Sequence, residues 1–157
     1  GGFVGNIEKT TEITLCYSSG TINGNADTGG FIGECKTGTI TNCYCTGNVT
    51  GTDDVGGFIG QCNSGVITTS YTACEVNGTG DIGGFSGTGG TCTDCYFMDN
   101  TPAALVNGYG TYLDTTARYY LSSYSGFNPD PPGTIIWTID NDKKINSGYP
   151  YLVGLVP

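Results

Sequence analysis

The residues best suited to chemistry in this chain are eight cysteines and a set of regularly spaced aspartates. The cysteines are even in number, and the 157-residue sequence contains no histidine to complete a typical zinc site. Disulfide bonds in an oxidising, extracellular compartment are therefore the first prediction. All eight are candidates: Cys16, Cys35, Cys43, Cys45, Cys62, Cys74, Cys92 and Cys95.

The spacing of the cysteines suggests partners. Residues 27 positions apart that stack in successive coils would have Cα atoms about 4.8 Å apart, which a disulfide tolerates. We expect Cys35–Cys62 most readily, because glycine-rich corners flank it. Parallel Cβ directions strain such bonds, so buried free thiols and a metal cluster stay open as alternatives. The pairs considered are Cys35–Cys62, Cys16–Cys43, Cys45–Cys74 and Cys92–Cys95.

Three aspartates, Asp27, Asp54 and Asp81, also recur at intervals of 27 residues, each two positions before a Gly-Gly pair. Stacked like charges at a surface repel by roughly 1 kcal/mol per pair. A Ca²⁺ ion held between the carboxylates and corner carbonyls would offset that repulsion. Alternatively, each aspartate caps backbone N–H groups of the following corner. Calcium is the one cofactor that the sequence suggests.

The elements that must position these residues follow from an internal repeat. Gly-Gly-Phe occurs four times, with spacings of 28, 27 and 27 residues, and a fixed period in this range indicates stacked units. Each unit holds three short β-prone pieces, and helical periodicity is absent. The sequence therefore predicts an all-β fold, a parallel β-solenoid with about 27 residues and three short strands per coil. The crossover preference favours a right-handed coil.

Residues 97–157 lack the repeat, so we expect an irregular C-terminal cap after a solenoid of residues 1–96. Within the cap, the sequence predicts a short helix over 117–124, N-capped by Thr115 or Thr116. A proline-rich loop at 128–133 and strands at 135–139 and 149–153 complete the prediction.

A column of tyrosines repeats with the coils: Tyr17, Tyr44, Tyr71 and Tyr96. These side chains could face outward as a stacking platform for surface glycans. They could equally close one edge of the core. Two sequons, at Asn48 and Asn77, are candidates for N-glycosylation.

Composition restricts the partners. The formal charge is −9 with only five basic residues, so nucleic acid and anionic lipid are unsuitable partners. No apolar run is long enough for membrane insertion. The sequence opens inside a repeat and without a signal peptide, so we expect a processed or partial chain.

The segment Gly29-Gly-Phe-Ile-Gly33, followed by Gly38-Thr-Ile-Thr-Asn-Cys-Tyr44 and Gly47-Asn-Val-Thr-Gly51, resembles the GLUG-motif repeat. Ile136-Trp-Thr-Ile139 with Gly148-Tyr-Pro-Tyr-Leu152 is similar to the segment that often closes such repeats. The resemblance implies a secreted or cell-surface β-solenoid protein, often adhesive or architectural, and some members also carry a peptidase domain. No catalytic residue is attached to the repeat itself.

Three function classes follow. A polysaccharide-active enzyme fits poorly, because the chain has no histidine, one arginine and no evident carboxylate pair. An adhesin that binds surface glycans is an alternative. The preferred hypothesis is a non-catalytic, extracellular filament or stalk subunit that polymerises head to tail through an open solenoid edge. The first strand would offer that edge through Gly1, Gly2, Phe3 and Val4. An apolar C-terminal segment would donate a strand to it through Tyr149, Tyr151, Leu152 and Val153.

Overall fold

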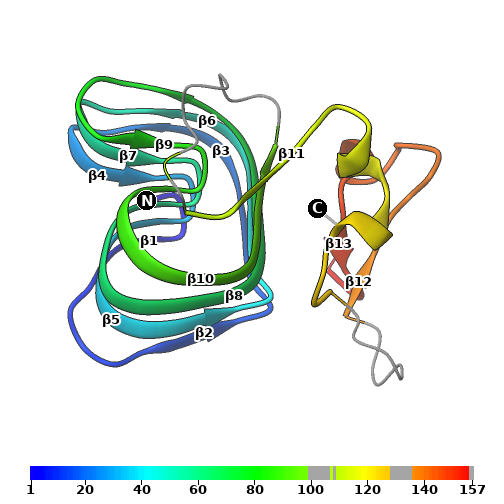
Figure 1. The fold of residues 1–157 in the computed structure, drawn as a ribbon, viewed down its shortest axis with the longest axis horizontal. Coiled ribbons are helices and arrows are strands. Elements are labelled where there is room, and N and C mark those ends of the chain that lie inside the picture. Colours follow the sequence, from blue (N-terminus) through cyan, green and yellow to red (C-terminus); the bar gives the residue numbers. More distant parts are fainter. Residues whose placement is uncertain (99–106, 108, 128–135, 156–157) are drawn as a thin grey trace.

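The computed structural model describes residues 1–98, 107, 109–127 and 136–155. Residues 1–98 wind into coils of parallel β-structure stacked on one another (Figure 1). The predicted all-β parallel solenoid is confirmed, because strands of successive coils pair in parallel about one repeat apart. The tail adds short 3-10 helices and strands, and the described residues contain no α-helix.

Successive coils pair residue by residue, as the repeat predicts. Ile32 pairs with Ile59 and Ile40 with Ile67, so the aliphatic columns are vertical ladders. The first coil comprises β1 (Val4–Ile7), β2 (Glu12–Thr14), β3 (Tyr17–Asn23) and β4 (Ala26–Gly29). The second comprises β5 (Ile32–Thr41), β6 (Tyr44–Thr50) and β7 (Asp53–Gly56). The third comprises β8 (Ile59–Asn77) and β9 (Ile82–Gly83), and β10 (Ser86–Met98) follows.

The strands differ from the prediction in length and number. β8 runs for 19 residues around the bends, and one eight-stranded sheet holds most of the coil, with a separate three-stranded sheet of β4, β7 and β9. Parallel pairing continues through the bends because equivalent residues turn in the same way. Asn42 and Thr69, one coil apart, both have a left-handed backbone with φ of 53° and 44°.

The core inside the coils is a ladder of phenylalanines. The ring centroids of Phe3 and Phe31 lie 4.7 Å apart, and those of Phe31–Phe58 and Phe58–Phe85 lie 4.9 Å apart. Phe31, Phe58 and Phe85 are fully buried, whereas Phe3 is 46% exposed. Apolar burial of about 25 cal/mol per Å² makes this ladder a main source of stability.

The tail begins as a further rung. β11 (Thr111–Leu113) pairs in parallel with β10, so that Thr111 lies opposite Tyr96. The elements that follow are η2 (Ala117–Tyr119), η3 (Leu121–Ser123), β12 (Trp137–Thr138), η4 (Asn146–Gly148) and β13 (Tyr151–Leu152). β12 and β13 form an antiparallel pair within the two predicted strands. The predicted loop at 128–133 lies outside the described residues.

The predicted helix over 117–124 is wrong. Two single-turn 3-10 helices stand there, because Tyr120 between them has extended backbone angles of −116° and 121°. The N-cap prediction is wrong as well. Neither threonine caps the turn; instead, an Asp114 carboxylate oxygen accepts hydrogen bonds from the backbone N–H groups of Thr116 and Ala117 at 2.8 and 2.7 Å.

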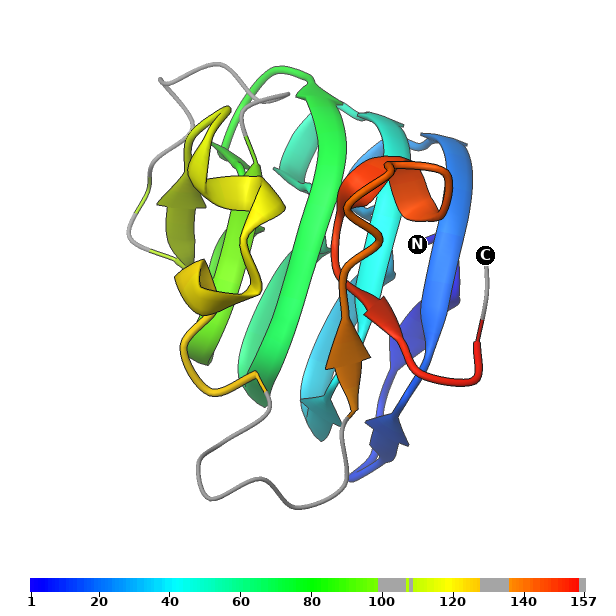
Figure 2. The same ribbon diagram turned by 90° about the vertical axis from the view of Figure 1, so that its right-hand side faces the viewer.

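The tail lies along the side of the coils (Figures 1 and 2). There it forms a second hydrophobic cluster with the tyrosine column. Trp137, Tyr124 and Leu152 of the tail are each almost completely buried in this cluster. Apart from β11, the described tail therefore covers a flank of the solenoid. In the part of the chain that the structure describes, no helix combines the length and apolarity needed to cross a membrane.

Candidate functional site

The tyrosine column closes an edge of the solenoid. The rings of Tyr17 and Tyr44 stack at 5.1 Å and those of Tyr44 and Tyr71 at 5.2 Å, while Trp137 tilts over the last two at 5.9 and 5.8 Å. Tyr44 and Tyr71 are fully buried, and burial raises their pKa values. The suggestion that this column is an outward platform for sugars is therefore wrong, because the tail covers it.

The first coil presents an open edge. The carbonyl oxygens of Phe31, Phe58 and Phe85 each accept two backbone N–H groups from the preceding coil, at 2.8–3.1 Å. Phe3 occupies the same column, yet no described residue donates to its carbonyl oxygen. The strand of Val4 pairs with β5 alone. Among the described residues, the edge containing Gly1, Gly2, Phe3 and Val4 therefore has no strand on its outer side, and the Phe3 ring beside it is exposed.

The predicted donor segment is already engaged within its own chain. Tyr149 and Leu152 are buried in the tail cluster, and Tyr151 is half-buried on β13, which pairs with β12. The Val153 backbone N–H donates to the Ile136 carbonyl at 2.8 Å, and only the Val153 side chain is exposed. Within its own chain the segment uses the buried side chains of Tyr149 and Leu152 and one edge of β13, whereas its role as a donor strand to another copy stays a prediction.

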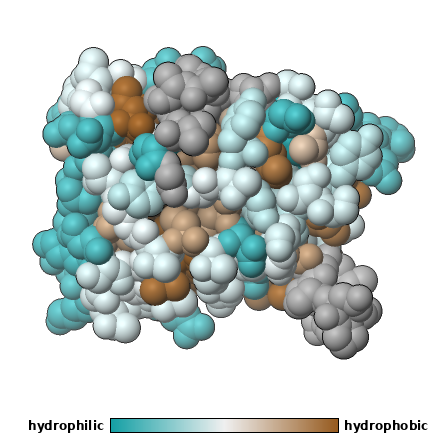
Figure 3. Space-filling view, viewed as in Figure 1, coloured by the Kyte–Doolittle hydropathy of each residue, from teal (hydrophilic) through white to brown (hydrophobic). Residues whose placement is uncertain are grey.

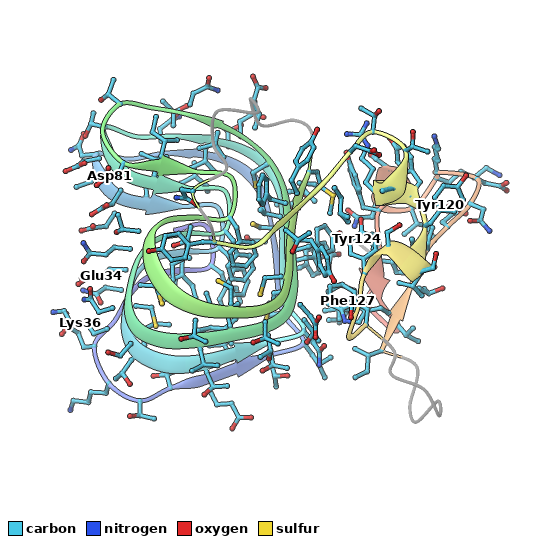
Figure 4. All side chains as sticks on the ribbon, in the orientation of Figure 1. Glu34, Lys36, Asp81, Tyr120, Tyr124 and Phe127 are labelled. Atoms are coloured by element: carbon cyan, nitrogen blue, oxygen red, sulfur yellow. The ribbon has the colours of Figure 1, made fainter. Side chains whose placement is uncertain are left out.

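The aspartate column forms an acidic cluster with an additional member. Carboxylate oxygens of Asp53, Asp54 and Asp81 lie within 4.8 Å of one another. Asp27, one coil away, has a raised pKa because of partial burial and then the charges of Asp54, Glu34 and Asp53. Sequence reasoning missed Asp53, although the Asp53-Asp54 doublet was a visible signal. Figure 3 shows hydrophilic residues on the side where Figure 4 labels Asp81 and Glu34.

Side chains, and not backbone amides, hold the middle carboxylate. Asp54 accepts hydrogen bonds from the Gln61 amide and the Thr88 hydroxyl, both at 2.9 Å. Asp27 and Asp54 themselves adopt left-handed φ values of 49° and 47° at the corner. The prediction that each aspartate caps the following corner is wrong for the described residues. Calcium at this cluster stays a proposal.

The cysteines are thiols in the structure, and the predicted partners are neighbours. Cys35 pairs in register with Cys62, and the sulfurs of Cys45 and Cys74 lie 3.7 Å apart. That distance exceeds a disulfide bond length of about 2.05 Å. Bond formation therefore remains a prediction for every pair.

The cysteine environments differ in access. Cys43 is buried, and burial raises the pKa of its thiol to about 12. Cys45 is also buried, with its pKa raised mainly by burial. Cys16 and Cys92 are only half-buried. The two sequon asparagines, Asn48 on β6 and Asn77 at the end of β8, are exposed, as an attached glycan requires.

Sequence reasoning also missed a pocket in the tail. Its cavity of about 350 Å³ lies between the η2 segment and the residues after β12. The walls that matter chemically are Thr115, Thr116, Tyr119, Tyr120, Asn141 and Lys143. The only signal in the sequence was the abundance of tyrosine in the tail, because residues from two separate segments form the pocket.

Comparison with known proteins supports the fold. No family model matches the sequence, and no similar sequence was found among curated proteins, so the resemblance to the GLUG-motif repeat stays a prediction. Among solved structures, the chain is similar to a proposed immunoglobulin A1 protease from Bacteroides ovatus, with 20% identity and a TM-score of 0.61. The similarity covers 92% of this chain and 48% of that one, so this chain spans about half its length. At this identity the likeness shows the fold alone.

Proposed function

We propose that this chain is a non-catalytic structural module of a secreted or cell-surface protein, and that it extends a filament or stalk through the edge of its first coil. One observation carries the proposal. Each Phe31, Phe58 and Phe85 carbonyl accepts two N–H groups, whereas no described residue supplies them to Phe3. A strand placed on this edge would gain the hydrogen bonds that every inner coil already makes.

The side chains favour the same kind of partner. The Phe3 ring is 46% exposed and already stacks on Phe31 with an interplanar angle of 5°. Another flat aromatic or aliphatic rung would continue that ladder and remove the ring from water. The partner is a further coil, from an upstream part of the same protein or from a second copy. Contact between one end of a copy and a different surface of the next does not close, so copies would form a filament.

The extracellular location rests on three observations of the sequence and structure. The chain contains eight cysteines, and the predicted partners of two pairs are neighbours in the coils. Both sequon asparagines are exposed. The repeat resembles a family of secreted and surface proteins. Oxidising surroundings would then allow bridges between coils.

Catalysis is the weaker proposal. The solved structure that this chain resembles is described as a proposed protease, and the same activity could be proposed here. The chain, however, has no histidine to activate a serine or cysteine nucleophile. For a polysaccharide-active enzyme, the carboxylates of Asp53, Asp54 and Asp81 are the candidates. Asp54 is already tied to Gln61 and Thr88, which favours a structural role.

Assembly of the purified 157-residue chain tests the proposal. We expect sedimentation velocity to show concentration-dependent association and negative-stain images to show filaments. Phe3→Lys places a charge on the exposed ring position and should abolish association. Val153→Lys is the matched control, because Val153 is 53% exposed and its backbone N–H donates within the tail to the Ile136 carbonyl. A monomer at every concentration, or equal association of the Phe3→Lys variant, would refute self-assembly.

A further inference from the structure

The tail pocket is lined by four exposed polar side chains. The Thr115 and Thr116 hydroxyls, the Tyr120 hydroxyl and the Asn141 amide line or border it. None of these side-chain groups has a hydrogen-bond partner among the described residues. Hydroxyls and an amide are groups that can both donate and accept. The pocket therefore offers several two-way hydrogen-bonding groups within a cavity of about 350 Å³.

The two nearby carboxylates are ionised, and backbone N–H groups already occupy them. Asp140 accepts hydrogen bonds from the backbone N–H groups of Asp142, Lys144 and Ile145 at 2.8–3.1 Å, and these bonds hold its pKa below the ordinary range. Asp114 is used in the same way by the turn at η2. Both carboxylates thus shape the loops that form the walls.

One aromatic face of the pocket is fixed and another is free. Tyr119 stacks on Tyr149 at 5.8 Å, and the Lys143 ammonium lies 3.9 Å from the centre of the Tyr119 ring. Tyr120 is 59% exposed and makes no ring contact with another described aromatic residue. Figure 4 shows Tyr120 on the outer part of the tail, away from the coils. An exposed aromatic ring beside polar groups suits a ligand with one apolar face and many hydroxyls.

We propose that this pocket binds a single neutral sugar unit, such as the terminal residue of a glycan. The C–H face of the sugar would lie on Tyr120, and its hydroxyls would bond to Asn141 and the threonines. The volume suits one sugar ring. An anion is less suitable, because the chain carries a formal charge of −9 and Lys143 already lies over Tyr119. The proposal is independent of filament assembly.

The pocket wall depends on Gly148. It has a left-handed φ of 82°, and a Cβ atom there would lie 2.7 Å from Lys143 Cγ and 3.3 Å from Tyr119 Cδ1. Only glycine allows Lys143 to lie close over the Tyr119 ring at this point. Gly148→Ala should therefore disturb the wall without removing any of the proposed hydrogen-bonding groups.

Nuclear magnetic resonance titration of the isotopically labelled chain tests the proposal. The probes are galactose, mannose, N-acetylglucosamine and, as an anionic comparison, glucuronic acid. We expect saturable shifts at Tyr120 and Asn141 with at least one neutral sugar, and affinity in the millimolar range. Tyr120→Ala should weaken binding by about tenfold, whereas Tyr120→Trp should retain it. Asn141→Ala should weaken binding without changing the melting temperature.

Two variants separate this site from the assembly edge. Phe3→Lys should bind the sugar normally even if it no longer associates. Val153→Ala removes an exposed side chain elsewhere on the tail and should leave binding unchanged. The proposal would be overturned if no neutral sugar gave a saturable shift. It would also be overturned by a response to glucuronic acid alone, or by unchanged affinity in both the Tyr120→Ala and Asn141→Ala variants.

Discussion

The indole N–H of Trp137 donates to the Asn42 side-chain oxygen at 3.1 Å, although 95 residues separate them in the sequence. The same Asn42 oxygen accepts a hydrogen bond from the Thr69 hydroxyl of the next coil at 2.7 Å. One corner amide therefore joins the tail to two coils. The tail is held by this contact and by the aromatic packing around it, since Trp137 also lies over the rings of Tyr44 and Tyr71 at 5.9 and 5.8 Å.

Trp137→Ala should release the tail. Trp137 is fully buried against Tyr44 and Tyr71, and truncation of a buried Trp costs about 3–5 kcal/mol. We expect faster proteolysis after residue 109 and a lower urea midpoint followed by circular dichroism, with the strand signal of the coils retained. Tyr120→Ala is the control, because its exposed ring should change stability by no more than about 0.5 kcal/mol. Equal proteolysis of the two variants would contradict this account of the tail.

Two phenylalanines of the same column should differ greatly in their effect on stability. Phe58 is fully buried between Phe31 and Phe85, so Phe58→Ala should destabilise by about 3–5 kcal/mol. Phe3 stacks on one side only and is 46% exposed, so Phe3→Ala should cost less than half as much. Thermal unfolding at low protein concentration measures both, so that assembly does not add to the apparent stability of wild type. Similar losses for the two variants would show that the column is not the core.

The sequence predicted the coils well because the length of the repeat fixes which residues of successive coils pair. Tyr44 and Tyr71 lie 27 positions apart, and their pairing follows once one coil is recognised. The docking of the tail could not be predicted, because the contact between Trp137 and Asn42 occurs once and spans unrelated segments. The carboxylates of Asp54 and Asp81 lie together, yet the partners of Asp54, Gln61 and Thr88, come from two different coils. Nothing in the local sequence around Asp54 identifies them.

The order of thiol alkylation should follow burial. Burial raises the pKa of Cys43 to about 12, so at pH 8 very little of it is the reactive thiolate. Cys45 is buried and its pKa is likewise raised, whereas Cys16 and Cys92 are half-buried and accessible. In reduced protein, short iodoacetamide pulses read by mass spectrometry should label Cys16 and Cys92 first. Early labelling of Cys43 or Cys45 would contradict the burial, and protection of all eight without reductant would support the predicted disulfides.

Chelation tests the proposed calcium. Asp54 already accepts hydrogen bonds from two neutral side chains, Gln61 and Thr88. These bonds offset part of its repulsion from Asp53 and Asp81. We therefore expect EDTA to leave the melting temperature unchanged. If EDTA lowered the melting temperature, if added calcium restored it, and if the Asp54→Asn variant showed no such change, an ion would bridge the cluster. Gln61→Leu should lower the melting temperature by removing a donor to Asp54 in either case.

Asp27→Asn should stabilise the chain at neutral pH. Partial burial and the charges of Asp54, Glu34 and Asp53 raise the pKa of Asp27 above its ordinary value of 3.8. The folded state therefore binds a proton on the Asp27 carboxyl more readily than the unfolded chain does. At pH 7 the ionised form of Asp27 is thus unfavourable in the folded state. Asparagine removes the charge and tolerates the left-handed φ of 49° at this corner.

The pH dependence of that gain gives the sharper test. The unfavourable contribution of ionised Asp27 disappears as the pH falls through its folded pKa and below 3.8, because the carboxyl is then neutral in both states. At pH 7 the variant should melt at a higher temperature than wild type. The gain in free energy of unfolding should be less than about 1 kcal/mol, because the group is partly exposed. Below pH 3.8 the two should melt at the same temperature. High salt should shrink the difference by screening the neighbouring carboxylates. A variant less stable than wild type at pH 7 would mean that the negative charge of Asp27 is needed at this corner, and a bound cation would be the explanation to test next.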